Sequence, residues 1–148
     1  MIKIIRTEDI DNFIKNYHRY KGAINRLEDE LLEKETEINK VGGGIVKVTK
    51  DRKPPNNLRM IQLFHELSGI QNEISDLMTR IELVDEFVSW LEEESETWHK
   101  IVEYRIRGWS YEQIGVKVNY SYSAVRKIYF GCIKEFLKYK SAKSTAKT

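Results

Sequence analysis

The sequence is poor in residues that interrupt helices or cross-link the chain. Its 148 residues include two prolines and one cysteine. Because Cys132 is the only cysteine, no disulfide can form within the chain, and its apolar neighbours predict a buried, chemically inert thiol. Scarce proline favours long helices, since proline in a helix interior removes a backbone hydrogen bond.

Long hydrophobic runs are also missing. The chain has no stretch of 18 or more apolar residues, the length of a membrane-spanning helix. The start of the chain, "MIKIIRTEDIDNF", lacks the apolar centre and the small-residue cleavage site of a signal peptide. We therefore expect a soluble, cytosolic protein with no membrane partner.

Motifs for catalysis and ligand binding are absent as well. The histidines His18, His65 and His99 lie on separate predicted elements, with no cysteine or carboxylate at ligand spacing, which predicts no metal site. No combination of serine, histidine and acid indicates a catalytic triad. The glycine-rich stretch 42–44 lacks the lysine and hydroxyl residue of a phosphate-binding loop. These absences predict a protein that is not an enzyme and needs no cofactor.

Charge is present, and it is unevenly distributed. Residues 95–148 carry 11 Lys and Arg against 4 Asp and Glu, whereas residues 1–94 carry 14 against 19. The C-terminal third is therefore strongly basic, although the whole chain has a net charge of only +2. Such a segment predicts an anionic partner, and nucleic acid is the commonest one for a soluble protein.

Two series of apolar residues recur in alternating steps of three and four. The first runs from Ile10 to Ile38, with Lys34 filling one position, and the second runs from Met60 to Leu91 without a polar interruption. This spacing predicts two long helices, which we expect to pack as an antiparallel, coiled-coil-like hairpin. Further apolar residues lie beside the second series and require another partner, either the C-terminal domain or a second copy of the chain: Phe64, Met78, Phe87 and Trp90.

The two predicted helices are joined by a glycine-rich connection, residues 41–57. Its three glycines predict the end of the first helix, and Pro54 and Pro55 prevent the second from beginning before about Asn56. The alternation in "IVKVTK" is compatible with a short strand. The basic side chains of this strand, and the basic side chains that follow it, would then contact DNA phosphate or a protein. We favour the alternative, a flexible basic linker.

Helix-capping signals divide residues 95–140 into three helices, of which the last two are joined by a tight turn. These signals are Ser95 or Thr97, Gly108, the pair Ser110 and Gln113, Asn119, and Ser121. The predicted fold is therefore all-α: a long helical hairpin over residues 1–94, then a three-helix helix-turn-helix domain over residues 95–140. Residues 141–148 are predicted to form a basic flexible tail.

The segment "IVEYRIRGWSYEQIGVKVNYSYSAVRKI" resembles the fourth region of bacterial sigma factors and related two-helix DNA readers. The matching positions are Glu112, Ile114, Gly115, Ser121, Val125, Arg126 and Ile128. The order of the predicted parts resembles the RinA and ArpU type of phage late-gene transcriptional regulators. The first resemblance covers roughly the last third of the chain, and the second rests on layout.

The resemblance implies that the start of the third helix enters the major groove of double-stranded DNA. The candidates for reading base edges are Tyr122, Ser123, Arg126 and Lys127. The candidates for holding phosphates are Arg105, Arg107, Lys117, Ser121 and Lys134. Tyr122 and Ser123 stand where sigma factors usually have arginine and glutamate, so we expect a recognition site other than the usual promoter hexamer.

The expected function is a sequence-specific DNA-binding transcription regulator of phage or prophage genes. The long helices predict a homo-oligomer, a dimer or higher, that acts as an activator, with bacterial RNA polymerase as a further candidate partner. Two alternatives remain open. A phage small terminase subunit recognising packaging-site DNA would assemble into a ring of many copies, and a polymerase-binding adaptor would show little affinity for bare DNA.

Overall fold

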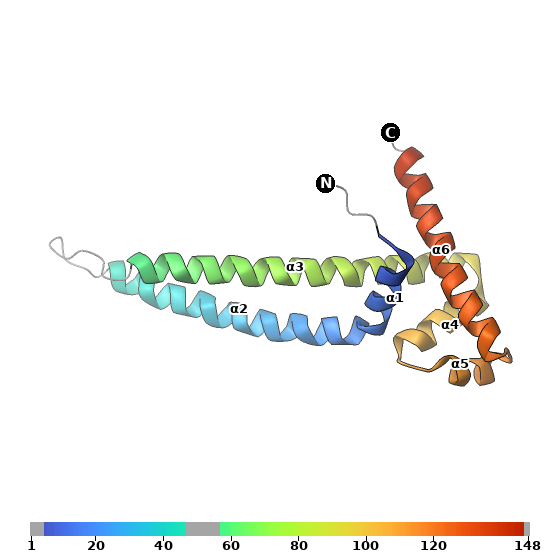
Figure 1. Cartoon of the computed structure of the whole chain (residues 1–148). Coiled ribbons are helices and arrows are strands. Elements are labelled where there is room, and N and C mark those ends of the chain that lie inside the picture. The colour runs from blue at the N-terminus through green and yellow to red at the C-terminus, as the bar shows by residue number, and fades with distance from the viewer. Residues whose placement is uncertain (1–4, 47–56, 147–148) are drawn as a thin grey trace. The chain divides into compact units, whose positions relative to one another are not determined.

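The computed structural model describes the backbone of residues 5–46 and 57–146. Within these ranges the chain forms six helices and no strand, so the predicted all-α class is confirmed. Figure 1 shows how these helices follow one another along the chain. The helices are α1 (Thr7–Lys15), α2 (Tyr17–Val46), α3 (Asn57–Glu94), α4 (Glu96–Ile106), α5 (Tyr111–Val118) and α6 (Tyr122–Ala146).

The first apolar series is not one helix, because the chain turns at Asn16 between α1 and α2. Asn16 has φ −105° and ψ 9°, and both its backbone N–H and its side-chain amide donate to the carbonyl of Asn12, at 3.0 and 2.8 Å. An asparagine side chain that satisfies a nearby carbonyl competes with continued helix. The predicted continuous helix is therefore wrong at this residue.

The glycine-rich connection also differs from its prediction. Helix α2 continues through Gly42, Gly43 and Gly44 to Val46, so the glycines do not end it. Glycine in a helix costs only about 1 kcal/mol relative to alanine, which does not by itself stop a helix. Helix α3 begins at Asn57, as the two prolines predict. The rest of the predicted strand and the predicted basic side chains fall within residues 47–56. These residues lie outside the part of the chain that the structure describes.

Contacts group the chain into two compact units, residues 20–79 and residues 1–19 with 80–148. We call them the hairpin unit and the C-terminal unit. The predicted boundary after Glu94 differs from this grouping, because α1 and the last part of α3 belong with α4, α5 and α6. Helix α6 also continues to Ala146, so residues 141–146 are helical, in contrast to the predicted flexible tail.

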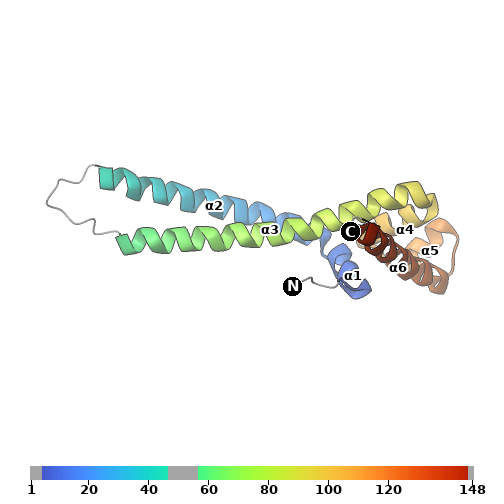
Figure 2. The same cartoon turned by 90° about the horizontal axis from the view of Figure 1, so that it is seen from above.

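In the hairpin unit, α2 and α3 lie side by side and run in opposite directions (Figure 1, Figure 2). Leu63 is fully buried, and Ile24 and Ile70 are 9 % exposed. Lys34, the polar residue in the first apolar series, pairs with Glu66 at 2.8 Å. Their hydrogen bond raises the pKa of Lys34 and lowers the pKa of Glu66, so both side chains favour their charged forms.

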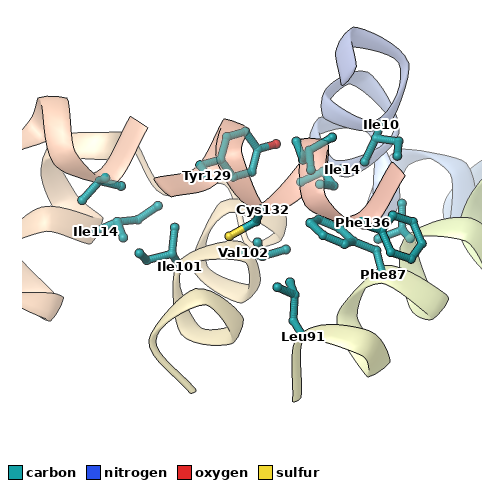
Figure 3. Packing of buried hydrophobic residues seen from close by; sticks show 13 residues of the cluster. Ile10, Ile14, Phe87, Leu91, Ile101, Val102, Ile114, Tyr129, Cys132 and Phe136 are labelled. Atoms are coloured by element: carbon teal, nitrogen blue, oxygen red, sulfur yellow. The ribbon is translucent and has the colours of Figure 1, made fainter. Parts of the chain in front are cut away.

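The C-terminal unit has a continuous hydrophobic core, shown in Figure 3. It contains Cys132, whose burial is confirmed and raises the pKa of its thiol to about 12. Beside it, the buried Tyr129 donates from its hydroxyl to Asp11 at 2.7 Å. The core is built from α1, the end of α3, α4, α5 and α6: Ile10, Ile14, Val84, Phe87, Leu91, Ile101, Val102, Ile114, Val125, Tyr129, Cys132, Ile133 and Phe136. Of the helices that the structure describes, none is long and apolar enough to span a membrane.

Candidate nucleic-acid interface

The three helices of the predicted reader are fixed by the caps that the sequence predicts. Ser95, Ser110 and Ser121 each accept a hydrogen bond from the backbone N–H three residues later, at 3.1–3.3 Å. Gln113 completes the capping box by accepting from the N–H of Ser110 at 2.9 Å. Asn119 adopts the left-handed conformation, with φ 63° and ψ 41°. These local bonds set where α4, α5 and α6 begin and where α5 ends.

The turn between α5 and α6 depends on a glycine. The backbone N–H of Tyr120 donates to the carbonyl of Gly115 at 3.0 Å. A Cβ atom at Gly115 would lie 2.5 Å from the carbonyl oxygen of Tyr120, which is closer than real Cβ contacts. Only glycine therefore allows this close approach of the turn to α5. Gly115 is one of the positions that carry the resemblance to two-helix DNA readers.

All four base-reading candidates are exposed and lie together at the start of α6. Tyr122, Ser123, Arg126 and Lys127 line one open groove of 370 Å³, together with Phe130, Gly131 and Lys134. Of the described residues that line this groove, three are basic and none is acidic. We call it the α6 groove. It combines hydrogen-bond donors with the aromatic surfaces of two rings.

A second hollow borders the α6 groove and has a different character. Its volume is 460 Å³, and it is lined by aromatic residues and by two acids, Glu94 and Glu135. Lys127 and Gly131 line both hollows. The positive surface of the α6 groove therefore borders acidic side chains where it meets the second hollow.

The phosphate candidates fall into two groups. Arg107, Lys117, Ser121 and Lys134 are exposed, and Lys134 lines the α6 groove. Arg105 is half-buried, with Nη1 donating to the carbonyl of Trp109 at 3.0 Å and Cζ 4.3 Å from the centre of the Tyr111 ring. Its guanidinium group therefore packs within the C-terminal unit, a placement that the sequence pattern did not indicate.

His99 has carboxylates close by, in contrast to the spacing argument from the sequence. Its Nε2 lies 3.4 Å from an oxygen of Glu92 and 3.5 Å from an oxygen of Glu103, one helical turn further along α4. Among the described residues, no group of three or more histidine, cysteine or acidic side chains has an arrangement that could hold a metal ion.

Comparisons with known proteins give no family assignment. No protein-family model, no curated protein and no solved structure matches the chain. The side chains that line the α6 groove and the helices that carry them are therefore the basis for proposing what it binds.

Proposed function

We propose that the chain is a sequence-specific DNA-binding transcription regulator of phage or prophage genes that acts as an oligomer. In this proposal α4, α5 and α6 form the DNA reader, α5 and α6 are its helix-turn-helix, and the start of α6 enters the major groove. The observation that carries the proposal is the α6 groove. Its base-reading candidates are exposed together on a helix whose opposite side is held in a hydrophobic core.

The exposed side chains of this surface can make the two kinds of contact that DNA binding requires, with base edges and with phosphates. Arg126 and Lys127 can donate to the O6 and N7 atoms of guanine, and a well-aligned pair of such bonds discriminates between bases by about 1–3 kcal/mol. Arg107, Lys117 and Lys134 supply positive charge for phosphates. The hydroxyl of Ser121 accepts from the backbone N–H of Ala124, which leaves its own hydrogen available to a phosphate oxygen.

The oligomeric part of the proposal is supported by the hairpin unit. Leu58, Ile61 and Phe64 on α3 are 83, 63 and 50 % exposed, and steps of three residues keep neighbouring members close on the helix surface. A second copy of the chain that covers these side chains would remove apolar surface from water. Two joined readers would then bind paired half-sites more tightly than one reader binds a single half-site.

The central test begins by selecting bound fragments from a random pool of double-stranded DNA with the full-length protein. The recovered site is then used in mobility-shift assays with the variant that combines Arg126→Ala and Lys127→Ala. We expect at least a tenfold loss of specific affinity, because two donors to base edges are removed. Circular dichroism should show unchanged helix content.

A matched variant controls for the loss of positive charge. Lys138→Ala combined with Lys143→Ala also removes two positive charges from exposed side chains of α6, but further along the helix and outside the α6 groove. It should weaken binding to specific and nonspecific DNA to a similar, small extent. If both double variants discriminate between sites equally well, or if no DNA sequence is enriched, the proposed reader is wrong.

A further inference from the structure

The exposed tyrosine at the start of α6 is the last member of a column of side chains that begins in α4. The guanidinium of Arg105 lies against the Tyr111 ring, with Cζ 4.3 Å from the ring centre. Tyr111, in α5, meets Tyr122 edge to face, with ring centres 5.5 Å apart and ring planes at 84°. Each helix of the predicted reader thus contributes one member, and Tyr122 keeps 50 % of its surface exposed.

The Arg105 end of this column is held in place by several contacts. Nη1 of Arg105 donates to the carbonyl of Trp109, and the Trp109 ring stacks on Tyr104 with centres 4.3 Å apart. The guanidinium also lies 5.8 Å from the ring of the buried Tyr129. Its Nε is buried and has no hydrogen-bond partner among the described residues. These contacts turn Arg105 toward aromatic rings, where a planar cation is stabilised by the ring faces.

Tyr122 lines the α6 groove together with the other base-reading candidates. Edge-to-face packing with Tyr111 fixes the position of the whole Tyr122 ring, whereas a tyrosine that only holds a phosphate needs its hydroxyl alone. A fixed ring offers an apolar surface, and the apolar feature of the major groove is the 5-methyl group of thymine. The geometry therefore favours an apolar contact with a base over a polar contact with the backbone.

We propose that Arg105 is a positioning residue that acts through Tyr111 to hold the Tyr122 ring against the 5-methyl group of a thymine. This inference rests on the proposed DNA-binding function and names the base chemistry that the site reads. It also gives Arg105 a different role from the phosphate contact expected from the sequence. Arg107, two residues later and exposed, remains a phosphate candidate.

Replacing thymines of the selected DNA site one at a time with deoxyuridine removes only the methyl group. At one position this replacement should lower the affinity of the wild-type protein about three- to fivefold, the effect of one lost buried methyl group. Tyr122→Phe should keep this response, because the ring remains. Tyr122→Ala and Arg105→Ala should bind thymine-containing and deoxyuridine-containing DNA equally.

Several outcomes would overturn the inference while leaving the proposed function intact. One is a DNA site at which no single replacement of thymine by deoxyuridine lowers the affinity of the wild-type protein. Another is loss of the response in Tyr122→Phe, which would assign the contact to the hydroxyl. Complete absence of DNA binding by the wild-type protein would instead reject the proposed function itself.

The dependence of affinity on salt separates positioning from phosphate contact. Arg107→Ala should lower the slope of log affinity against log salt concentration by about one, because one phosphate contact is lost. Arg105→Ala should leave this slope unchanged. Arg105→Lys keeps the charge without the planar group, so it should behave like Arg105→Ala in the deoxyuridine test. A full response in Arg105→Lys would contradict the stacking role.

A variant in α5 keeps the test usable if removal of Arg105 unfolds the protein. Tyr111→Leu retains an apolar side chain beneath Tyr122 but cannot make the edge-to-face contact. Thermal unfolding by circular dichroism identifies which variants are folded. A folded Tyr111→Leu variant should respond less to deoxyuridine than the wild type, and an undiminished response would show that the column does not position Tyr122.

Discussion

The hairpin unit and the C-terminal unit cover their apolar residues to different extents. In the C-terminal unit, residues of five helices form one buried cluster around Tyr129 and Phe136. Among the described side chains of the hairpin unit, only Leu63 is fully buried, whereas Leu58, Ile61 and Phe64 are largely exposed. A helix with several neighbours is covered on several sides, and one with a single neighbour is not. The C-terminal unit thus buries a large apolar cluster within the chain, whereas the hairpin unit leaves a row of apolar side chains that a partner can cover.

The largest expected effect comes from breaking the core of the C-terminal unit. Phe136 packs against Phe87 and Trp90, with ring centres 4.9 and 5.6 Å apart. Phe136→Ala should therefore destabilise the unit by about 3–5 kcal/mol, measured by denaturant unfolding. Ile70→Ala in the hairpin unit should cost less, because fewer atoms are removed and Ile70 is already 9 % exposed, whereas Phe136 is fully buried. An equal or larger cost for Ile70→Ala would contradict the contrast between the units.

A smaller loss of stability is expected when a methyl group is added where α5 closely approaches the turn that follows it. Gly115→Ala places a methyl group against the carbonyl of Tyr120 and should cost about 1–3 kcal/mol, with weaker DNA binding because α6 is displaced. Gly69→Ala is the control in the hairpin unit, since no atom outside the neighbouring residues and the nearby backbone of α3 lies within 4 Å of the added group. This substitution should stabilise α3 by about 0.5–1 kcal/mol. Thermal unfolding of both variants checks the opposite signs.

The buried hydrogen bond between α6 and α1 gives a prediction with a pH dependence. Tyr129→Phe leaves the carboxylate of Asp11, 8 % exposed, with Lys15 at 3.0 Å but without the tyrosine hydroxyl. The expected loss is about 1–3 kcal/mol at neutral pH, measured by denaturant unfolding. A loss below a few tenths of a kcal/mol would show that the bond contributes little.

The same variant should also change stability in alkaline solution. Burial, together with the hydrogen bond to Asp11, raises the pKa of Tyr129 far above its ordinary value of 10.0. Above about pH 10, the hydroxyl of Tyr129 loses its proton in the unfolded chain but keeps it in the folded chain. The stability of the wild-type protein therefore falls as pH rises. Tyr129→Phe has no hydroxyl that can ionise at this position, so its loss of stability relative to the wild type should shrink above pH 10. Cys132 is present in both proteins and does not affect the comparison.

The local structure of the reader could be predicted because the determining contacts are close in sequence. Ser110 and Gln113 cap the same helix end, and Asn119 needs only its own left-handed conformation. The turn at Asn16 could not be predicted in this way, because the apolar spacing continues from Ile10 across it. The local hydrogen bonds of Asn16 permit a break there, but the break also depends on α1 packing into a core formed by residues far along the chain.

The orientation of charged and polar side chains was also beyond sequence reasoning. Arg105 looks like a phosphate contact in a basic segment, but its actual neighbours, Tyr111 and Tyr129, come from two other helices. The partner of Tyr129 is Asp11, 118 positions away. Periodicity indicates which face of a helix is apolar, but it does not identify the polar partner that a distant helix supplies.

The smallest effect on folding, and the sharpest test of the hairpin unit, is expected from its exposed apolar residues. Ile61→Lys combined with Phe64→Lys should leave the helix content almost unchanged, because both side chains are at least half exposed. If a second copy covers them, however, the charges should shift the sedimenting species at micromolar concentration toward monomer. Gln62→Lys combined with His65→Lys adds lysines at neighbouring exposed positions of α3 and should preserve the assembly. Should both double variants sediment like the wild type, the exposed row would not be the contact between copies, and its apolar side chains would need another explanation.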